Sequence, residues 1–82
     1  MSYEVKFKPL AIKDLKKINK IDQKRIVEKI EILGNDLNGD VKKLTNFTPE
    51  YRLRVGDYRV LFEIEDNNII IYTIKHRKES YK

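Results

Sequence analysis

A Gly-Asp dipeptide at residues 56–57 separates two segments, 51–55 and 58–63, in which apolar and polar side chains alternate. Alternation with a period of two is typical of half-buried strands, and Gly-Asp is a favoured two-residue turn between antiparallel strands. A third segment of this kind, residues 69–75, follows the turn-forming residues 65–68. The C-terminal half of the chain therefore predicts three strands joined by two hairpin turns.

The N-terminal part predicts one strand and two helices. Residues 3–7 alternate apolar and charged side chains, as in a strand, and apolar residues recur at helical spacing between residues 11 and 18. In a second helix we expect Asp22 to be the N-cap, Ile21 to form a hydrophobic staple with Ile26, and Gly34 to end the helix. Its apolar stripe consists of Ile26, Ile30 and Leu33.

These elements predict an α+β fold in a single domain spanning residues 1–82, with the order β-α-α-β-β-β. An antiparallel sheet covered on one face by an N-terminal helical hairpin is the simplest packing for this order. Residues 35–50 are expected to form a surface loop, with room for a short helical or extended turn at residues 41–44. The sheet residues expected in the core are Leu53, Val55, Val60, Phe62, Ile69 and Ile71.

Composition narrows the kind of function. The chain has 82 residues, no cysteine and one histidine, His76, so disulfides and sulfur-ligated metal sites are excluded and a deep small-molecule cleft is disfavoured. No segment is long and apolar enough to cross a membrane, and we expect a cytoplasmic protein. The net charge of +5 favours a polyanion or an acidic protein as partner.

The predicted hairpin gathers positive charge on one face. If Val55 pairs with Tyr58, Arg54 stands opposite Arg59, and Arg52 lies two residues along the same face. Like charges facing each other in a sheet cost on the order of 0.2–1 kcal/mol, which a bound anion would offset. Guanidinium groups match phosphate oxygens well. The alternative is a solvated face that keeps the sheet soluble.

The tail that follows the third strand of this sheet adds groups suited to RNA cleavage. We expect His76, Arg77 and Tyr81 to emerge near the hairpin arginines, and Tyr72 could stack on a base. Cleavage of RNA by its own 2′-hydroxyl needs a proton acceptor, a proton donor to the leaving oxygen and cations for the transition state. The alternatives are a surface histidine without a task and a tyrosine that only packs.

Two segments carry a resemblance to a known family. They are Tyr51-Arg52-Leu53-Arg54-Val55-Gly56-Asp57-Tyr58-Arg59-Val60 and His76-Arg77-Lys78-Glu79-Ser80-Tyr81. Together with the length and element order, they resemble the RelE/ParE toxin superfamily, and the RelE branch most closely. The resemblance implies a RelE-like fold and the toxin of a type II toxin–antitoxin system. Such a toxin is a ribosome-dependent endoribonuclease that cuts messenger RNA in the A site by 2′-hydroxyl attack, without a metal ion or other cofactor.

The resemblance also implies roles for particular residues. Arg59, Arg77 and Tyr81 match catalytic positions of the family, whereas Arg52 and Arg54 stand where the best-known member type has lysines and are assigned to RNA binding. An arginine does not lose its proton, so the general base would have to be His76 or Tyr81, or catalysis would rest on positioning and charge. The implied partners are messenger RNA, the ribosome and an acidic, RelB-like antitoxin, with larger toxin–antitoxin complexes also open.

Two other functions are compatible with the sequence. ParE-like members share the fold but inhibit DNA gyrase, and they generally lack the full catalytic set, so the arginines and Tyr81 favour the RelE branch. A non-catalytic RNA-binding or interaction module is the second alternative, because the expected lysines are absent.

Overall fold

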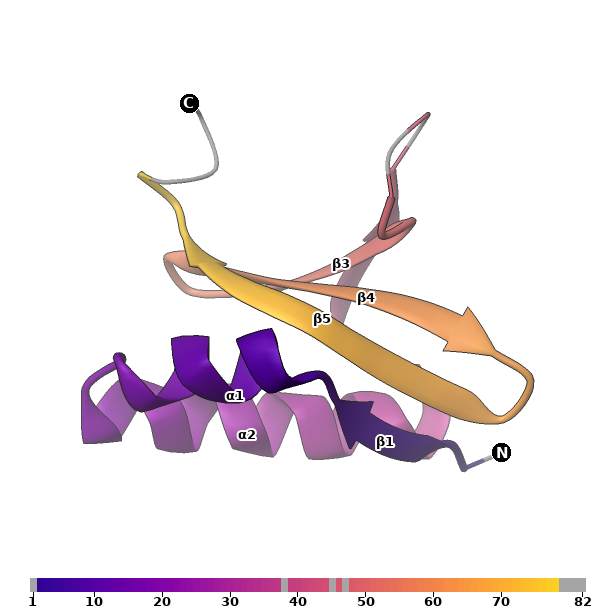
Figure 1. The fold of residues 1–82 in the computed structure, drawn as a ribbon. Helices are drawn as coiled ribbons and strands as arrows, with labels where there is room; N and C mark the ends of the chain where they lie inside the picture. Colours follow the sequence, from indigo (N-terminus) through magenta and orange to yellow (C-terminus); the bar gives the residue numbers. More distant parts are fainter. Residues whose placement is uncertain (1, 38, 45, 47, 79–82) are drawn as a thin grey trace.

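The protein is an α+β molecule with both helices on one side of a single sheet, as Figure 1 shows, and this confirms the predicted fold class. The computed structural model describes residues 2–37, 39–44, 46 and 48–78. Its elements are β1 (Glu4–Phe7), α1 (Pro9–Lys16), α2 (Lys20–Asp36), β2 (Asp40–Lys43), β3 (Tyr51–Val55), β4 (Tyr58–Glu65) and β5 (Asn68–His76).

The sheet has five strands in the order β1-β5-β4-β3-β2. The three pairs from β2 to β5 are antiparallel, but β1 runs parallel to β5, so the sheet is mixed. No hairpin sets the direction of β1, because two helices and three strands separate it from β5 in the chain. The fifth strand, β2, lies in the segment expected to be a loop; it is only four residues long, and Val41 pairs with Leu53 of β3.

The core lies between the sheet and the helices. All six predicted sheet residues are buried, as are the three residues of the α2 stripe, which confirms the predicted packing. Ala11 of α1 and Ile74 of β5 complete this buried cluster. Among the described residues, no helix lies on the opposite face of the sheet (Figure 1).

Helix α2 begins earlier than predicted. Asn19 is its N-cap: the Asn19 Oδ1 atom accepts a hydrogen bond from the Asp22 backbone N–H at 2.9 Å, and its amide Nδ2 donates to Asp22 Oδ2 at 2.9 Å. Asp22 is thus the third residue of the first turn and not the cap. Ile21 is 76% exposed, so the expected hydrophobic staple with Ile26 is not formed.

Helix α2 also ends later than predicted. It continues through Gly34 to Asp36 and is closed by Leu37, whose φ is 55° and whose N–H donates to the Leu33 carbonyl at 2.8 Å. Gly34 does not end the helix. It allows close packing against β1, because a Cβ atom on it would lie 2.9 Å from Val5 Cγ2. The missing side chain lets β1 approach the helix closely enough for Tyr3 N to donate to the Gly34 carbonyl at 2.6 Å.

Helix α1 holds the C-terminal half of β5 in place. Asp14 Oδ2 accepts hydrogen bonds from the Thr73 hydroxyl and from the Ile74 backbone N–H, the latter at 3.1 Å. These bonds occupy the edge of β5 beyond the point where β1 ends at Phe7. Within the described part of the chain, neither helix is long and apolar enough to span a membrane.

Candidate functional site

A line of charged residues crosses the sheet face that the helices leave open. Backbone pairing places Asp40 of β2 opposite Arg54, Arg54 opposite Arg59, and Arg59 opposite Lys75 of β5. The predicted register of the hairpin is therefore confirmed. Paired residues share a face, and Val60 and Ile74, one position along from Arg59 and Lys75, point into the core. We call Arg52, Arg54, Arg59, Lys75 and Arg77 the cationic face.

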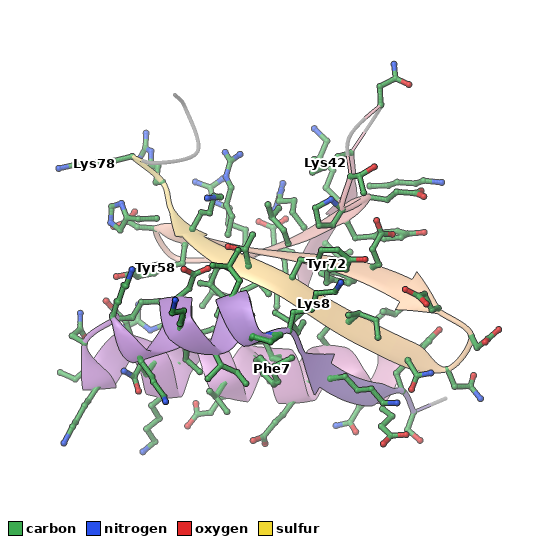
Figure 2. The ribbon with its side chains drawn as sticks, viewed as in Figure 1. Phe7, Lys8, Lys42, Tyr58, Tyr72 and Lys78 are labelled. Atoms are coloured by element: carbon green, nitrogen blue, oxygen red, sulfur yellow. The ribbon has the colours of Figure 1, made fainter. Side chains whose placement is uncertain are left out.

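Arg52 is held against β2. Its Nη1 atom donates to the Asp40 carbonyl at 3.0 Å and lies 3.4 Å from Asp40 Oδ1, and its side chain is only 14% exposed. Lys42 stands opposite Arg52 and projects from the side of the sheet away from the helices (Figure 2). Asp40 offsets part of the charge of Arg52, so Arg54, which is exposed, is the more available cation of β3.

The end of the hairpin is the most concentrated part of this face. The Arg77 backbone N–H donates to the Asp57 carbonyl at 2.6 Å, which ties the residue after β5 to the β3–β4 turn. As a result Arg54, Arg59 and Arg77 line one small hollow of about 10 Å³ together with the turn residues Gly56, Asp57 and Tyr58. The structure thus brings together three of the predicted arginines, which come from three separate chain segments.

His76 lies on the opposite side of the sheet from the arginines of the cationic face. It pairs with Tyr58, and their rings meet edge to face with centroids 5.1 Å apart. In Figure 2 Tyr58 lies between the sheet and the helices. A second hollow of about 310 Å³ lies there, lined by Asp14, Lys17, Ile18, Tyr58, Ile74 and His76. His76 Nδ1 accepts a hydrogen bond from the Lys78 N–H at 3.2 Å. The expected grouping of His76 with the cationic face is therefore wrong.

A bulge in β5 explains this difference. Leu61 pairs with Thr73, but the next residue, Phe62, pairs with Ile71, so Tyr72 is an additional residue in β5. Strict alternation from Ile71 would have put residue 76 on the open face and residues 75 and 77 under the helices. The extra residue reverses these assignments. Lys75 and Arg77 therefore lie on the open face with Arg59, and His76 lies on the helix side.

Lys75 is the residue of this face that reasoning from the sequence missed. The alternation of apolar and polar residues in the sequence does not reveal the bulge. The spacing of the buried residues in the structure does, because it changes from two, between Ile69 and Ile71, to three, between Ile71 and Ile74.

The other predicted residues lie as follows. Tyr72 has the Lys8 ammonium over its ring, 4.3 Å from the centroid (Figure 2). Glu63 accepts a hydrogen bond from the Glu50 N–H at 2.9 Å. Tyr81 lies outside the described residues.

Comparison with known proteins identifies the class to which this fold and this face belong. A model described as the ParE toxin of type II toxin–antitoxin systems, parDE, matches residues 5–81. The chain belongs to this family, as a RelE-like toxin of the RelE/ParE superfamily.

The similar proteins include toxins from archaea and bacteria. Toxin RelE3 of Methanocaldococcus jannaschii is 37% identical over 83 residues, which cover 95% of this chain and 94% of the relative. The toxin in a RelB–RelE antitoxin–toxin complex from Methanococcus jannaschii superposes with a TM-score of 0.78 at 35% identity, covering 93% of this chain and 94% of that one. A chain of the RelBE2 complex from Mycobacterium tuberculosis gives 0.81 at 27% identity, with 94% and 100% covered.

Proposed function

We propose that this toxin is an endoribonuclease that cuts messenger RNA in the A site of the ribosome and so stops translation. The observation that carries the proposal is the hollow where Arg54, Arg59 and Arg77 meet. Three arginines from three segments line this hollow, and guanidinium groups match the charge and hydrogen-bond geometry of a phosphate group.

The chemistry that such a hollow supports is transfer of the phosphate within the RNA. The 2′-oxygen attacks the adjacent phosphorus, the bond from phosphorus to the 5′-oxygen breaks, and the products are a 2′,3′-cyclic phosphate and a 5′-hydroxyl. One proton leaves the 2′-hydroxyl and one joins the 5′-oxygen. Negative charge on the non-bridging oxygens increases in the transition state, and fixed cations stabilise it more than they stabilise the ground state.

Backbone hydrogen bonds fix the positions from which these side chains extend. Arg54 and Arg59 lie on paired strands, and the hydrogen bond from Arg77 N–H to the Asp57 carbonyl fixes the third backbone relative to the turn. Preorganised donors need no rearrangement when charge develops, which is the main way in which such groups accelerate a reaction. Arg59 and Arg77 are therefore assigned to transition-state stabilisation, and Arg52 and Arg54 to binding of the RNA backbone.

The shape of the site supports a requirement for the ribosome. The hollow has a volume of only about 10 Å³, so it cannot by itself enclose a nucleotide and align the 2′-oxygen with the bond that breaks. Alignment of the reacting atoms contributes a large part of the rate in such reactions. A messenger held by the ribosome would arrive with its backbone already oriented.

The proposed partner that controls the toxin is an acidic, RelB-like antitoxin in the cytoplasm. The net charge of +5 and the cationic face favour an acidic chain. Similar toxins have been solved in complexes with RelB antitoxins, in Methanococcus jannaschii and in Pyrococcus horikoshii. Covering the cationic face would block RNA and neutralise opposed like charges at the same time.

A second candidate function is inhibition of DNA gyrase, which the ParE description of the family model favours. One experiment separates the two. The purified toxin is incubated with programmed ribosomes, with the same messenger free in solution, and with gyrase and DNA, and RNA ends and trapped gyrase–DNA complexes are measured. We expect new messenger ends in the A-site codon only in the presence of ribosomes. Intact messenger with trapped gyrase–DNA complexes would replace the proposal by the second function, and neither product would leave a binding module.

A further inference from the structure

We propose that Lys75 is a catalytic residue of this site and donates the proton to the 5′-oxygen that leaves. The inference rests on the proposed RNA cleavage. Its basis is the bulge at Tyr72, which turns Lys75 onto the open face directly opposite Arg59. Adjacent strands lie about 4.8 Å apart, so the Lys75 backbone is one strand away from Arg59 and two from Arg54.

The cationic face contains charge in abundance but few groups that can transfer a proton. Arginine remains protonated at any relevant pH, so Arg54, Arg59 and Arg77 bind and stabilise anions without exchanging protons. His76 lies on the helix side of the sheet against Tyr58. An ammonium group is different, because it carries a positive charge and can also release a proton.

The position of Lys75 separates it from the other lysines described near this face. Lys42 pairs with Arg52 on the far strand β2, and the Lys8 ammonium lies over the Tyr72 ring. Lys78 is exposed and lies beyond the end of β5, outside the strand pairing that fixes Lys75 opposite Arg59. Lys75 is half-buried and stands between Arg59, across the strand pair, and Arg77, two residues along the chain. Lys75 does not line the hollow itself, but it is paired with Arg59, which does, so its long side chain starts one strand away from a phosphate bound there.

The step balances as follows. The bond from the 2′-oxygen to phosphorus forms while the bond from phosphorus to the 5′-oxygen breaks, and the 2′-hydroxyl proton passes to solvent water. The Lys75 ammonium gives one proton to the 5′-oxygen and becomes a neutral amine. Water then returns a proton to the amine, so the enzyme ends the reaction as it began.

The test uses two messengers on programmed ribosomes, one ordinary and one with sulfur in place of the 5′-oxygen at the cleavage position. A thiolate is a far better leaving group than an alkoxide and needs no proton donor. Wild type, Lys75→Ala and Lys75→Arg are compared, with Lys24→Ala as a control lysine exposed on α2. We expect both Lys75 variants to cut the ordinary messenger about 10²- to 10⁴-fold more slowly, and the sulfur messenger within a few-fold of wild type.

Each of the other possible results would contradict the inference, and each would do so for a different reason. Full activity of Lys75→Ala on the ordinary messenger would show that the site works without this residue. Rescue by Lys75→Arg, or an equal loss on both messengers, would show a role in charge, binding or structure and not in proton donation. If wild type cuts neither messenger, the proposed function itself fails and the inference falls with it. Cleavage of the sulfur messenger by Lys75→Ala also shows that the variant is folded.

Discussion

Arg54 of β3 lies directly opposite Arg59 of β4, beside the hairpin turn on the sheet face that the helices leave open. Two like charges in this arrangement oppose folding by on the order of 0.2–1 kcal/mol. Asp40, which is paired with Arg54, has its carboxylate 3.4 Å from Arg52 Nη1. We expect the binding of an anion to offset this cost.

Arg54→Gln tests this balance between stability and binding. The variant keeps most of the side-chain stem but removes the charge, so we expect an unchanged or slightly higher free energy of unfolding at low salt. The affinity for single-stranded RNA should fall, and the slope of log K against log salt should become shallower by about 0.7, the value for one lost phosphate contact. Urea unfolding and a salt titration of RNA binding measure the two effects. An unchanged slope would remove Arg54 from the binding surface.

The Asp14 carboxylate should be a large contributor to stability for a partly exposed residue. It accepts hydrogen bonds from the Thr73 hydroxyl and the Ile74 N–H, and both donors lose their partner in Asp14→Ala. We expect a loss of about 1–3 kcal/mol in the free energy of unfolding, measured with urea. Lys13→Ala, at an exposed position of the same helix, is the control and should change little. Equal unfolding midpoints for the two variants would contradict this account of how α1 holds β5.

Gly34→Ala should destabilise the protein although alanine is the better helix former. Alanine in a helix gains about 1 kcal/mol over glycine, but the new Cβ atom would lie 2.9 Å from Val5 Cγ2. Overpacking of this kind typically costs about 1–3 kcal/mol. In the double variant with Val5→Ala, Gly34→Ala should become neutral or stabilising, as a double-mutant cycle by urea unfolding would show. Destabilisation of equal size in both backgrounds would mean that Val5 is not the obstacle.

The sequence predicted the parts of this fold that local chemistry determines. The Gly-Asp turn at 56–57 sets the register of the hairpin, and the α2 stripe matches the apolar face of the sheet, so the core and the opposition of Arg54 and Arg59 could be foreseen. The prediction of Asp22 as the N-cap was wrong, because Asn19, three residues earlier, is an equally good N-cap residue. Gly34 is needed for its close contact with Val5 of β1. This contact joins residues far apart in the sequence, so the local pattern around Gly34 could not predict it.

The candidate site was predicted only in part, for one physical reason. Sequence alternation assigns side chains to faces, and a single extra residue reverses the assignment for everything that follows. The extra residue at Tyr72 does this in β5. His76 therefore lies on the helix side of the sheet, and Lys75 lies on the same face as the arginines. Arg77 was expected near the hairpin arginines because the tail follows the third strand, and the hydrogen bond from its N–H to the Asp57 carbonyl holds it there.

The most direct test of the central claim is the rate of messenger cleavage on programmed ribosomes by wild type, Arg59→Ala, Arg77→Ala and the control Lys24→Ala. New 3′ ends in the A-site codon are mapped over time, and urea unfolding verifies that each variant is folded. Wild type and the control should cut at the same rate, and each arginine variant should be about 10²- to 10³-fold slower, the usual effect of removing one transition-state donor. Folded arginine variants that cut as fast as wild type would contradict the claim that the cationic face is the catalytic site.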